Sequence, residues 1–217
     1  MQAFFKVSGI SASVPGMAHK STAMSFRRFS HQLETEGTGI WPGFLTPGDL
    51  RDVRADFDLV HDSHRFQRAS TGQGEDKKVR DLVRRDEVHW LERGDSAPAQ
   101  SMLWAKFDSL KRQFNRHFFL GLSGFEGHYA AYPAGGFYKR HVDCFQRDNA
   151  RVISLILYLN MDWKPCDGGR LRLYGADSHF DINPVGGTVV CFMSSEKEHE
   201  VLPSHAKRAS LAGWFKR

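Results

Sequence analysis

The chain has 217 residues, of which 41% are hydrophobic and 25% charged, a composition typical of a folded globular domain rather than of a disordered chain. Thirty Lys and Arg residues against 25 Asp and Glu residues give a net charge of +5, too small an excess to predict a nucleic-acid-binding surface. Three cysteines without a C-x-x-C pair predict neither a disulfide framework nor a zinc cluster, so we expect a reducing, cytoplasmic setting. No stretch approaches the roughly 18 apolar residues that span a bilayer, and we expect no membrane partner.

The first part of the chain predicts an arm followed by helices. Residues 1–38 are rich in Ser, Ala, Gly and Thr, and we expect a poorly ordered arm that precedes a single domain over 39–217. A helix is predicted to begin after Thr46, which suits the N-cap and is followed by a proline, and to end near Val60. A second helix is predicted over Ala99–Leu120, where apolar side chains recur at spacings of three and four and give one buried face.

From Gly127 onward, short β-rich runs alternate with Gly, Pro and Asp. The predicted strands are His128–Tyr132, Val152–Asn160, Arg170–Tyr174, Thr188–Met193 and Ser210–Phe215. Helices followed by many short strands predict an α+β fold with a double-stranded β-helix core, that is, a jelly-roll or cupin-like barrel, braced by the N-terminal helices.

Two histidines and an aspartate predict a metal site. In a strand, His141 and Asp143 would point to the same side, because side chains alternate with a period of two. A second imidazole from His199, on a distant strand, would complete a 2-His-1-carboxylate facial triad, the geometry expected of non-haem Fe(II) oxygenases. In this class the open metal positions accept a bidentate 2-oxo acid and dioxygen. Arg208 is placed to supply the cation that holds the distant carboxylate of that acid.

The whole series of motifs resembles the catalytic core of the 2-oxoglutarate-dependent prolyl 4-hydroxylases, above all the hypoxia-inducible-factor type and its bacterial relatives. The matching stretches are Tyr132-Pro133, His141-Val142-Asp143, Tyr158-Leu159-Asn160, Gly168-Gly169, His199-Glu200-Val201 and Arg208 to Trp214. The resemblance extends from about Arg84 to the end of the chain. It implies the double-stranded β-helix fold and an Fe(II)-dependent oxygenase activity.

The resemblance also implies which residues form the site. His141, Asp143 and His199 would bind Fe(II), and no catalytic residue is expected beyond this metal centre. The 2-oxoglutarate co-substrate would be bound by Arg208, Tyr158, Tyr132 and Ser210. Arginine suits the C5 carboxylate because its planar fork binds a carboxylate through two hydrogen bonds. Dioxygen would be the second co-substrate, with ascorbate as a reductant.

Further upstream, Arg84 to Trp90 resembles the R-G-D-x-x-x-W loop and strand that cover the peptide substrate in these hydroxylases, although Arg85 replaces the glycine. The implied substrate-binding residues are Arg84, Asp86, Trp90, Arg151 and Trp214. By the same match, Asp86 would pair with Arg151 as the loop closes. Three other histidines, His128, His179 and His205, match no role, and we expect them to be exposed or structural.

The sequence therefore predicts a monomeric enzyme that hydroxylates C4 of a prolyl residue in a protein and releases succinate and CO2. Elongation factor Tu is a target type known among the bacterial relatives. One alternative is an oxygenase that acts on a free amino acid, another small metabolite or a nucleic-acid base, and another is a non-catalytic iron or oxygen sensor. The stretch around Asp86 and Trp90 favours a peptide, and we expect no nucleic-acid partner because a basic, aromatic-rich lid is missing. The complete ligand set with Arg208 argues against a non-catalytic role.

Overall fold

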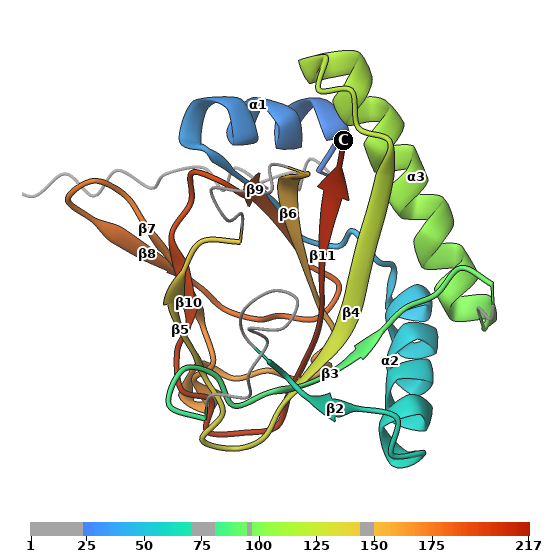
Figure 1. Cartoon of the computed structure of the whole chain (residues 1–217), viewed down its shortest axis with the longest axis vertical. Coiled ribbons are helices and arrows are strands. Elements are labelled where there is room, and N and C mark those ends of the chain that lie inside the picture. Colours follow the sequence, from blue (N-terminus) through green and yellow to red (C-terminus); the bar gives the residue numbers. More distant parts are fainter. Residues whose placement is uncertain (1–23, 71–80, 95–96, 144–149) are drawn as a thin grey trace, which may run out of the picture.

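The computed structural model describes residues 24–70, 81–94, 97–143 and 150–217, in which two antiparallel sheets lie opposite each other (Figure 1). The larger sheet has the strand order β1 (Thr38–Trp41), β9 (Val189–Met193), β6 (Arg151–Tyr158), β11 (Arg208–Lys216), β4 (Gly124–Tyr132), β3 (Glu87–Trp90) and β2 (Gln67–Arg68). The smaller sheet has the order β5 (Tyr138–His141), β10 (His199–Val201), β7 (Leu171–Tyr174) and β8 (His179–Ile182). This arrangement confirms the predicted α+β class with a jelly-roll core.

Three helices pack beside the larger sheet: α1 (Phe26–Glu36), α2 (Pro47–Asp62) and α3 (Pro98–Phe118) (Figure 1). The predicted start of α2 is confirmed by a capping box, in which the Thr46 hydroxyl accepts from the Asp49 amide at 3.1 Å and the Asp49 carboxylate accepts from the Thr46 amide at 3.3 Å. The predicted helix over 99–120 is confirmed as α3. A short 3-10 helix, Pro165–Asp167, precedes β7.

The structure corrects the expected arm. Helix α1 begins after Ser25, whose hydroxyl accepts from the Arg28 amide, and it buries Phe29 and Leu33 one turn apart. Strand β1 then joins the edge of the larger sheet, so the chain is ordered well before residue 38. Residues 1–23 lie outside the described residues, and the single domain over 39–217 stays a prediction.

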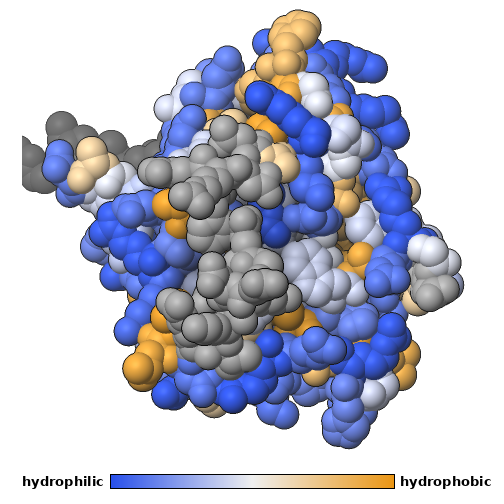
Figure 2. Space-filling model, in the orientation of Figure 1, coloured by the Kyte–Doolittle hydropathy of each residue, from blue (hydrophilic) through white to orange (hydrophobic). Residues whose placement is uncertain are grey.

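Aromatic contacts fix the strands that later form the site. The rings of Phe107 in α3 and Phe125 in β4 are 4.4 Å apart, and those of Phe114 in α3 and Phe215 in β11 are 5.3 Å apart. Because side chains alternate along a strand, the opposite faces of β4 and β11 are free to line the space between the sheets. Most of the surface visible in Figure 2 is hydrophilic, as expected when the aromatic and aliphatic residues fill the core. Among the described residues, no helix combines the length and apolarity that a membrane crossing requires.

The five predicted strands are confirmed as β4, β6, β7, β9 and β11, with ends that shift by a few residues. Strands β1, β2 and β8 were missed, and β5 and β10 were predicted only through the metal ligands that they carry. These strands are short, and β5 and β8 expose polar side chains, so no apolar run marks them.

Candidate metal centre and adjoining pocket

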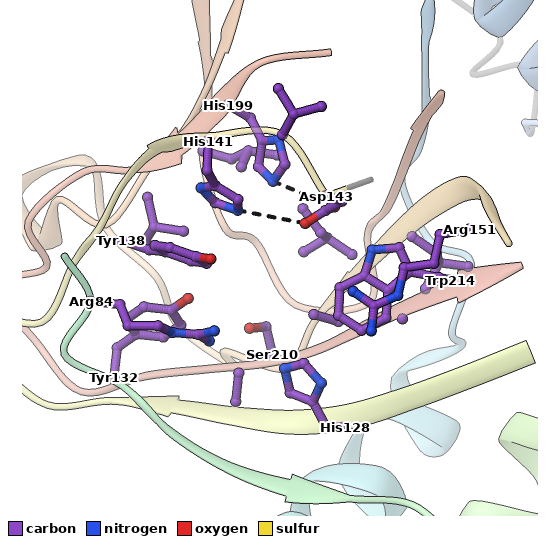
Figure 3. Close-up of a pocket in the computed structure, with 18 of the residues that line it drawn as sticks. Arg84, His128, Tyr132, Tyr138, His141, Asp143, Arg151, His199, Ser210 and Trp214 are labelled. Atoms are coloured by element: carbon purple, nitrogen blue, oxygen red, sulfur yellow. Dashed lines mark ion pairs between the residues drawn. The ribbon is translucent and has the colours of Figure 1, made fainter. Parts of the chain in front are cut away.

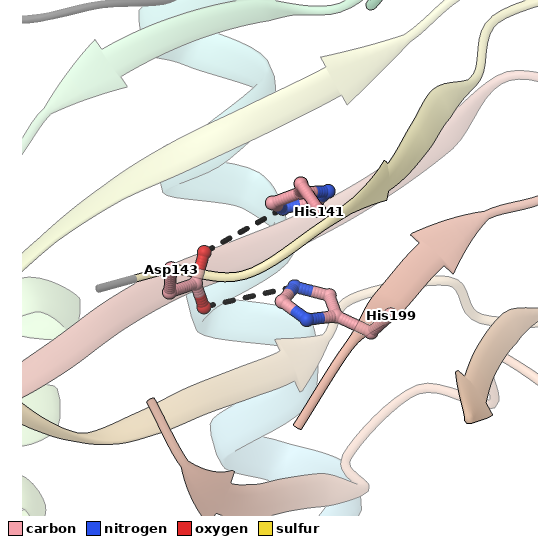
Figure 4. A group of neighbouring side chains, drawn as sticks. All are labelled: His141, Asp143 and His199. Atoms are coloured by element: carbon pink, nitrogen blue, oxygen red, sulfur yellow. Dashed lines mark ion pairs between the residues drawn. The ribbon is translucent and has the colours of Figure 1, made fainter. Parts of the chain in front are cut away.

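The structure brings His141, Asp143 and His199 together. In the pairing of β10 with β5, His199 lies opposite His141. The Nε2 atom of His141 is 3.5 Å from Asp143 Oδ1, and Nε2 of His199 is 3.6 Å from Asp143 Oδ2 (Figure 4). One ligand atom from each residue lies within 4.8 Å of the others, a spacing that one metal ion can bridge.

The sequence-based explanation of why these three side chains converge was wrong in one detail. Strand β5 ends at His141, and Asp143 lies in a bend two residues later. The chain turn, rather than strand alternation, therefore directs the carboxylate toward the imidazoles.

Backbone carbonyls orient both imidazole rings. Nδ1 of His141 is 2.7 Å from the Lys139 carbonyl, and Nδ1 of His199 is 3.0 Å from the Lys197 carbonyl. Since a carbonyl can only accept, each Nδ1 donates to its carbonyl, and Nε2 is the ring nitrogen that faces Asp143 and would bind a metal. Burial lowers the pKa of His199, which favours the neutral form that a metal ligand requires.

Asp143 is held as a carboxylate. Burial by itself would raise its pKa, but the positive charge that His199 and His141 carry when protonated, together with hydrogen bonds from His141 and the Ser154 hydroxyl, lowers the pKa of Asp143 well below its usual range. The Ser154 hydroxyl donates to Asp143 Oδ2 at 2.7 Å and lies 2.9 Å from the Ser194 hydroxyl. Two imidazoles beside one fixed carboxylate form a donor set that fits Fe(II).

Arg208 lines the same cavity as these residues, and the cavity has a volume of about 360 Å³. Its side chain is buried, Nε donates to the Gly169 carbonyl at 3.0 Å, and Nη1 donates to the Ser210 hydroxyl at 3.0 Å. No acidic side chain among the described residues forms an ion pair with it. A buried charge without a counter-ion is costly, so the site fits an anionic ligand.

The surroundings of Arg208 are closely fitted. Gly169 has φ of +58°, and a Cβ there would lie 3.0 Å from Arg208 Cδ, so a larger residue would displace the guanidinium. The guanidinium carbon is 4.8 Å from the Tyr132 ring centroid and 5.3 Å from that of Tyr158. The Tyr158 hydroxyl is buried and has no hydrogen-bond partner in the described part of the chain, and burial raises the pKa of Tyr158 to about 12, so it remains a donor.

Among the described residues, the Arg208 guanidinium thus has no ion pair and the neighbouring Tyr158 hydroxyl has no hydrogen bond. A carboxylate ligand would supply both interactions. Arg208, Tyr132 and Ser210 line the cavity and are here called the arginine end; Tyr158 packs against Arg208 without lining the cavity. A 2-oxo diacid fits this arrangement, because one of its ends can bind a metal while the other pairs with Arg208.

The other end of the cavity is aromatic. It is lined by Trp90, His128, Arg151 and Trp214, here called the tryptophan end. Figure 3 shows the last three of these side chains. The guanidinium carbon of Arg151 lies 3.6 Å from the ring centroid of Trp214, and its Nε donates to Glu126 at 2.8 Å.

The expected pair between Asp86 and Arg151 is absent. Instead, Arg84 donates to both carboxylate oxygens of Asp86, at 2.7 and 2.6 Å, and the Asp86 side chain is fully buried away from the cavity. Arg84 itself lines the cavity and stacks on the ring of Tyr138 at 4.2 Å. Asp86 and Arg151 do not pair in this structure because each has a nearer partner, Arg84 for Asp86 and Glu126 for Arg151.

Two cavity residues escaped the sequence analysis. Tyr138 stacks on the His141 ring, with centroids 3.6 Å apart and an angle of 17° between the planes. Its position in the same short strand as His141 was the available signal. His128 is buried in the cavity wall, whereas an exposed or structural role was expected; its alternation with Tyr132 along β4 could have revealed it.

Comparison with known proteins gave consistent results. Residues 127–216 match the 2OG-Fe(II) oxygenase superfamily. The crystal structure of a Pseudomonas putida prolyl-4-hydroxylase is 38% identical with a TM-score of 0.79, and the match covers 87% of this chain and 97% of that chain. A prolyl hydroxylase from Trichoplax adhaerens, in complex with a hypoxia inducible factor oxygen degradation domain peptide fragment, is 28% identical with a TM-score of 0.78, and the match covers 87% of each chain.

Curated relatives match over a shorter region. Prolyl hydroxylase EGLN3 of Homo sapiens and of Mus musculus is 37% identical over 91 residues, which are 40% of this chain. The matched region spans only 38% of the length of these relatives.

Proposed function

The chain belongs to the 2OG-Fe(II) oxygenase superfamily, and on that premise we propose that it hydroxylates C4 of a prolyl residue in a protein substrate. The observation that carries the proposal is the arrangement of one cavity. A buried Arg208, which has no acidic partner in the described part of the chain, lines the same cavity as the triad of His141, Asp143 and His199.

The residues present divide the work of such a site. His141, Asp143 and His199 would hold Fe(II), and Arg208 would orient 2-oxoglutarate through its C5 carboxylate. When bound, Fe(II) and 2-oxoglutarate supply the activation of dioxygen for C–H hydroxylation, with succinate and CO2 as co-products. The protein contributes geometry: it fixes the ligands, excludes water from the arginine end and leaves the tryptophan end open to substrate.

The tryptophan end supports a peptide substrate. Trp90 is 44% exposed, and its ring centroid lies 6.2 Å from that of Trp214, so two indoles frame the entrance. Indole faces pack well against an apolar ring such as that of proline. The Trichoplax adhaerens relative named above, solved with a peptide fragment, supports the same assignment.

The test is a proline-specific hydroxylation assay. The protein is loaded anaerobically with Fe(II) and 2-oxoglutarate, exposed to air with ascorbate and a host-cell lysate, and the lysate is searched by mass spectrometry for prolines that gain one oxygen atom. Purified elongation factor Tu is the first individual substrate that we propose to test. His199→Ala is the matched control.

We expect hydroxyproline and a matching amount of succinate with the wild-type chain alone. Absence of hydroxyproline above the control would refute a protein prolyl hydroxylase. Turnover of a small molecule, or metal binding without turnover, would favour the alternative oxygenase or the sensor.

A further inference from the structure

His128 occupies a defined position at the tryptophan end. In the larger sheet it lies opposite Trp90 of β3 on one side and Ala212 of β11 on the other. Its side chain points from β4 into the cavity (Figure 3) and is 5% exposed. It also lines a second groove, which runs outside along β2 and β3 past Arg65 and His89. A chain that passed from this groove to the metal centre would cross His128.

Polar groups at this place lack partners. Nδ1 of His128 is buried without a hydrogen bond in the described part of the chain, and so is the indole nitrogen of Trp214. The imidazole packs against two aromatic rings, with centroid distances of 4.8 Å to Trp90 and 5.5 Å to Trp214, and the three rings form one cluster. Buried polar atoms are rarely left unpaired, and such atoms in a cavity wall point to a ligand that supplies the missing bond.

The charge state of His128 restricts the ligand. Burial, and then the positive charges of Arg84 and Arg151, lower the pKa of His128 to about 3. The imidazole is therefore neutral near pH 7 and offers one N–H donor and one acceptor nitrogen. A neutral donor and acceptor match an uncharged amide better than a carboxylate or an ammonium group.

We propose that His128 is a specificity-determining residue whose imidazole hydrogen-bonds a backbone amide of the peptide substrate, where the peptide passes over the cluster of Trp90, His128 and Trp214. This inference rests on the proposed function, since it requires a peptide substrate. It adds a polar contact to a surface that otherwise offers indole faces and one stacked guanidinium.

The experiment compares His128→Leu with His128→Asn and His128→Gln, which retain a polar atom near Nδ1 and Nε2 respectively. A proline-centred peptide library is screened against the wild-type protein with Fe(II) and 2-oxoglutarate under anaerobic conditions, where binding occurs without turnover. The Kd of the selected peptide and the Kd of 2-oxoglutarate are then measured for every variant. His179→Leu, which removes an exposed histidine of β8, is the control.

We expect His128→Leu to bind the peptide about tenfold more weakly, with one amide variant within about threefold of wild type and the Kd of 2-oxoglutarate unchanged. Equal peptide affinity in all variants would overturn the proposal. So would a parallel loss of 2-oxoglutarate affinity, which indicates a structural role, or amide variants that behave like His128→Leu, which indicates a role of shape alone.

A second measurement tests the backbone amide itself. Single peptide bonds of the selected peptide are replaced by esters, and one ester should weaken binding to the wild type but not to His128→Leu. If no ester shows this coupling, the contact is not to the backbone and the proposal fails. If the wild type binds no member of the library, both this inference and the proposed function fail, whereas the other negative results leave the proposed function standing.

Discussion

The two ends of the cavity are built on different physical principles. At the arginine end, Arg208 is 2% exposed and donates hydrogen bonds to the Gly169 carbonyl and the Ser210 hydroxyl. At the tryptophan end, Trp90 is 44% exposed and Arg151 rests on an indole face. The first end fixes a charge in one orientation, and the second offers a surface.

This difference explains what each end can select. A buried guanidinium without a counter-ion accepts a small anion of defined length and rejects neutral ligands, because burying the charge unpaired is costly. Aromatic faces and a neutral imidazole discriminate between ligands by shape and by single hydrogen bonds. Such weak contacts suit a peptide substrate that must bind and be released. Variants should therefore divide into those that affect the metal, the co-substrate and the peptide separately.

The largest effect is expected from Asp143→Ala. It removes the anionic ligand between the two imidazoles and abolishes the charge that favours a cation. We expect Fe(II) affinity to fall by about 100-fold or more, and hydroxylation to be lost. Anaerobic Fe(II) titration measures this loss, with His179→Ala as the control variant. Unchanged Fe(II) affinity in Asp143→Ala would show that the metal site is misassigned.

At the arginine end, Arg208→Gln should weaken 2-oxoglutarate binding by about 10- to 100-fold, since a hydrogen bond to a charged group contributes about 1.5 to 3 kcal/mol. Tyr158→Phe removes one neutral donor and should cost less, about fivefold. Calorimetric titration of 2-oxoglutarate into the Fe(II)-loaded protein gives both values, and Fe(II) affinity should not change. If Tyr158→Phe proved the more damaging, Arg208 would not be the principal anchor.

A smaller effect is expected from Ser154, which connects the metal site to the larger sheet. Ser154→Ala removes the hydroxyl that donates to Asp143 Oδ2, and we expect Fe(II) affinity to fall about tenfold because the carboxylate loses its fixed orientation. Ser154→Thr keeps the donor and should retain most of the affinity. Comparable losses in both variants would point to a packing effect instead.

The metal centre could be predicted from the sequence because a short motif carries two of its three ligands. His141 and Asp143 are two residues apart, and only a few residue types can bind Fe(II) in this pattern. The helices α2 and α3 were also readable, since a cap or a regular apolar period marks each one. The first helix was missed because its buried face rests on Phe29 and Leu33 amid charged residues.

The residues of the tryptophan end and their contacts could not be predicted from the sequence in the same way. The burial of His128 depends on the register of β3, β4 and β11, which no local pattern specifies. The failed pairing of Asp86 with Arg151 has a similar origin, because Arg84 and Glu126 compete for the same charges in three dimensions. Residues whose role depends on neighbours from other strands need the structure.

The smallest effect concerns the stability that the tryptophan end contributes as pH changes. Burial and two nearby arginines lower the pKa of His128 from 6.5 to about 3, so below pH 6.5 the unfolded chain takes up a proton that the folded chain refuses. This neutral histidine therefore lowers stability progressively as the pH falls from 6.5 toward 3. Between about pH 7 and pH 5.5 it should account for about 1 kcal/mol of the loss in unfolding free energy.

His128→Leu cannot bind this proton and should lose about that much less stability over the same interval, whatever its stability at pH 7. Urea unfolding of wild type and variant at both pH values measures the difference, and all other titrating groups cancel in the comparison to the extent that they are independent of position 128. Equal losses in the two proteins would mean that His128 is protonated in the folded state. The tryptophan end would then carry a positive charge, and its ligand would have to be sought among anionic peptides.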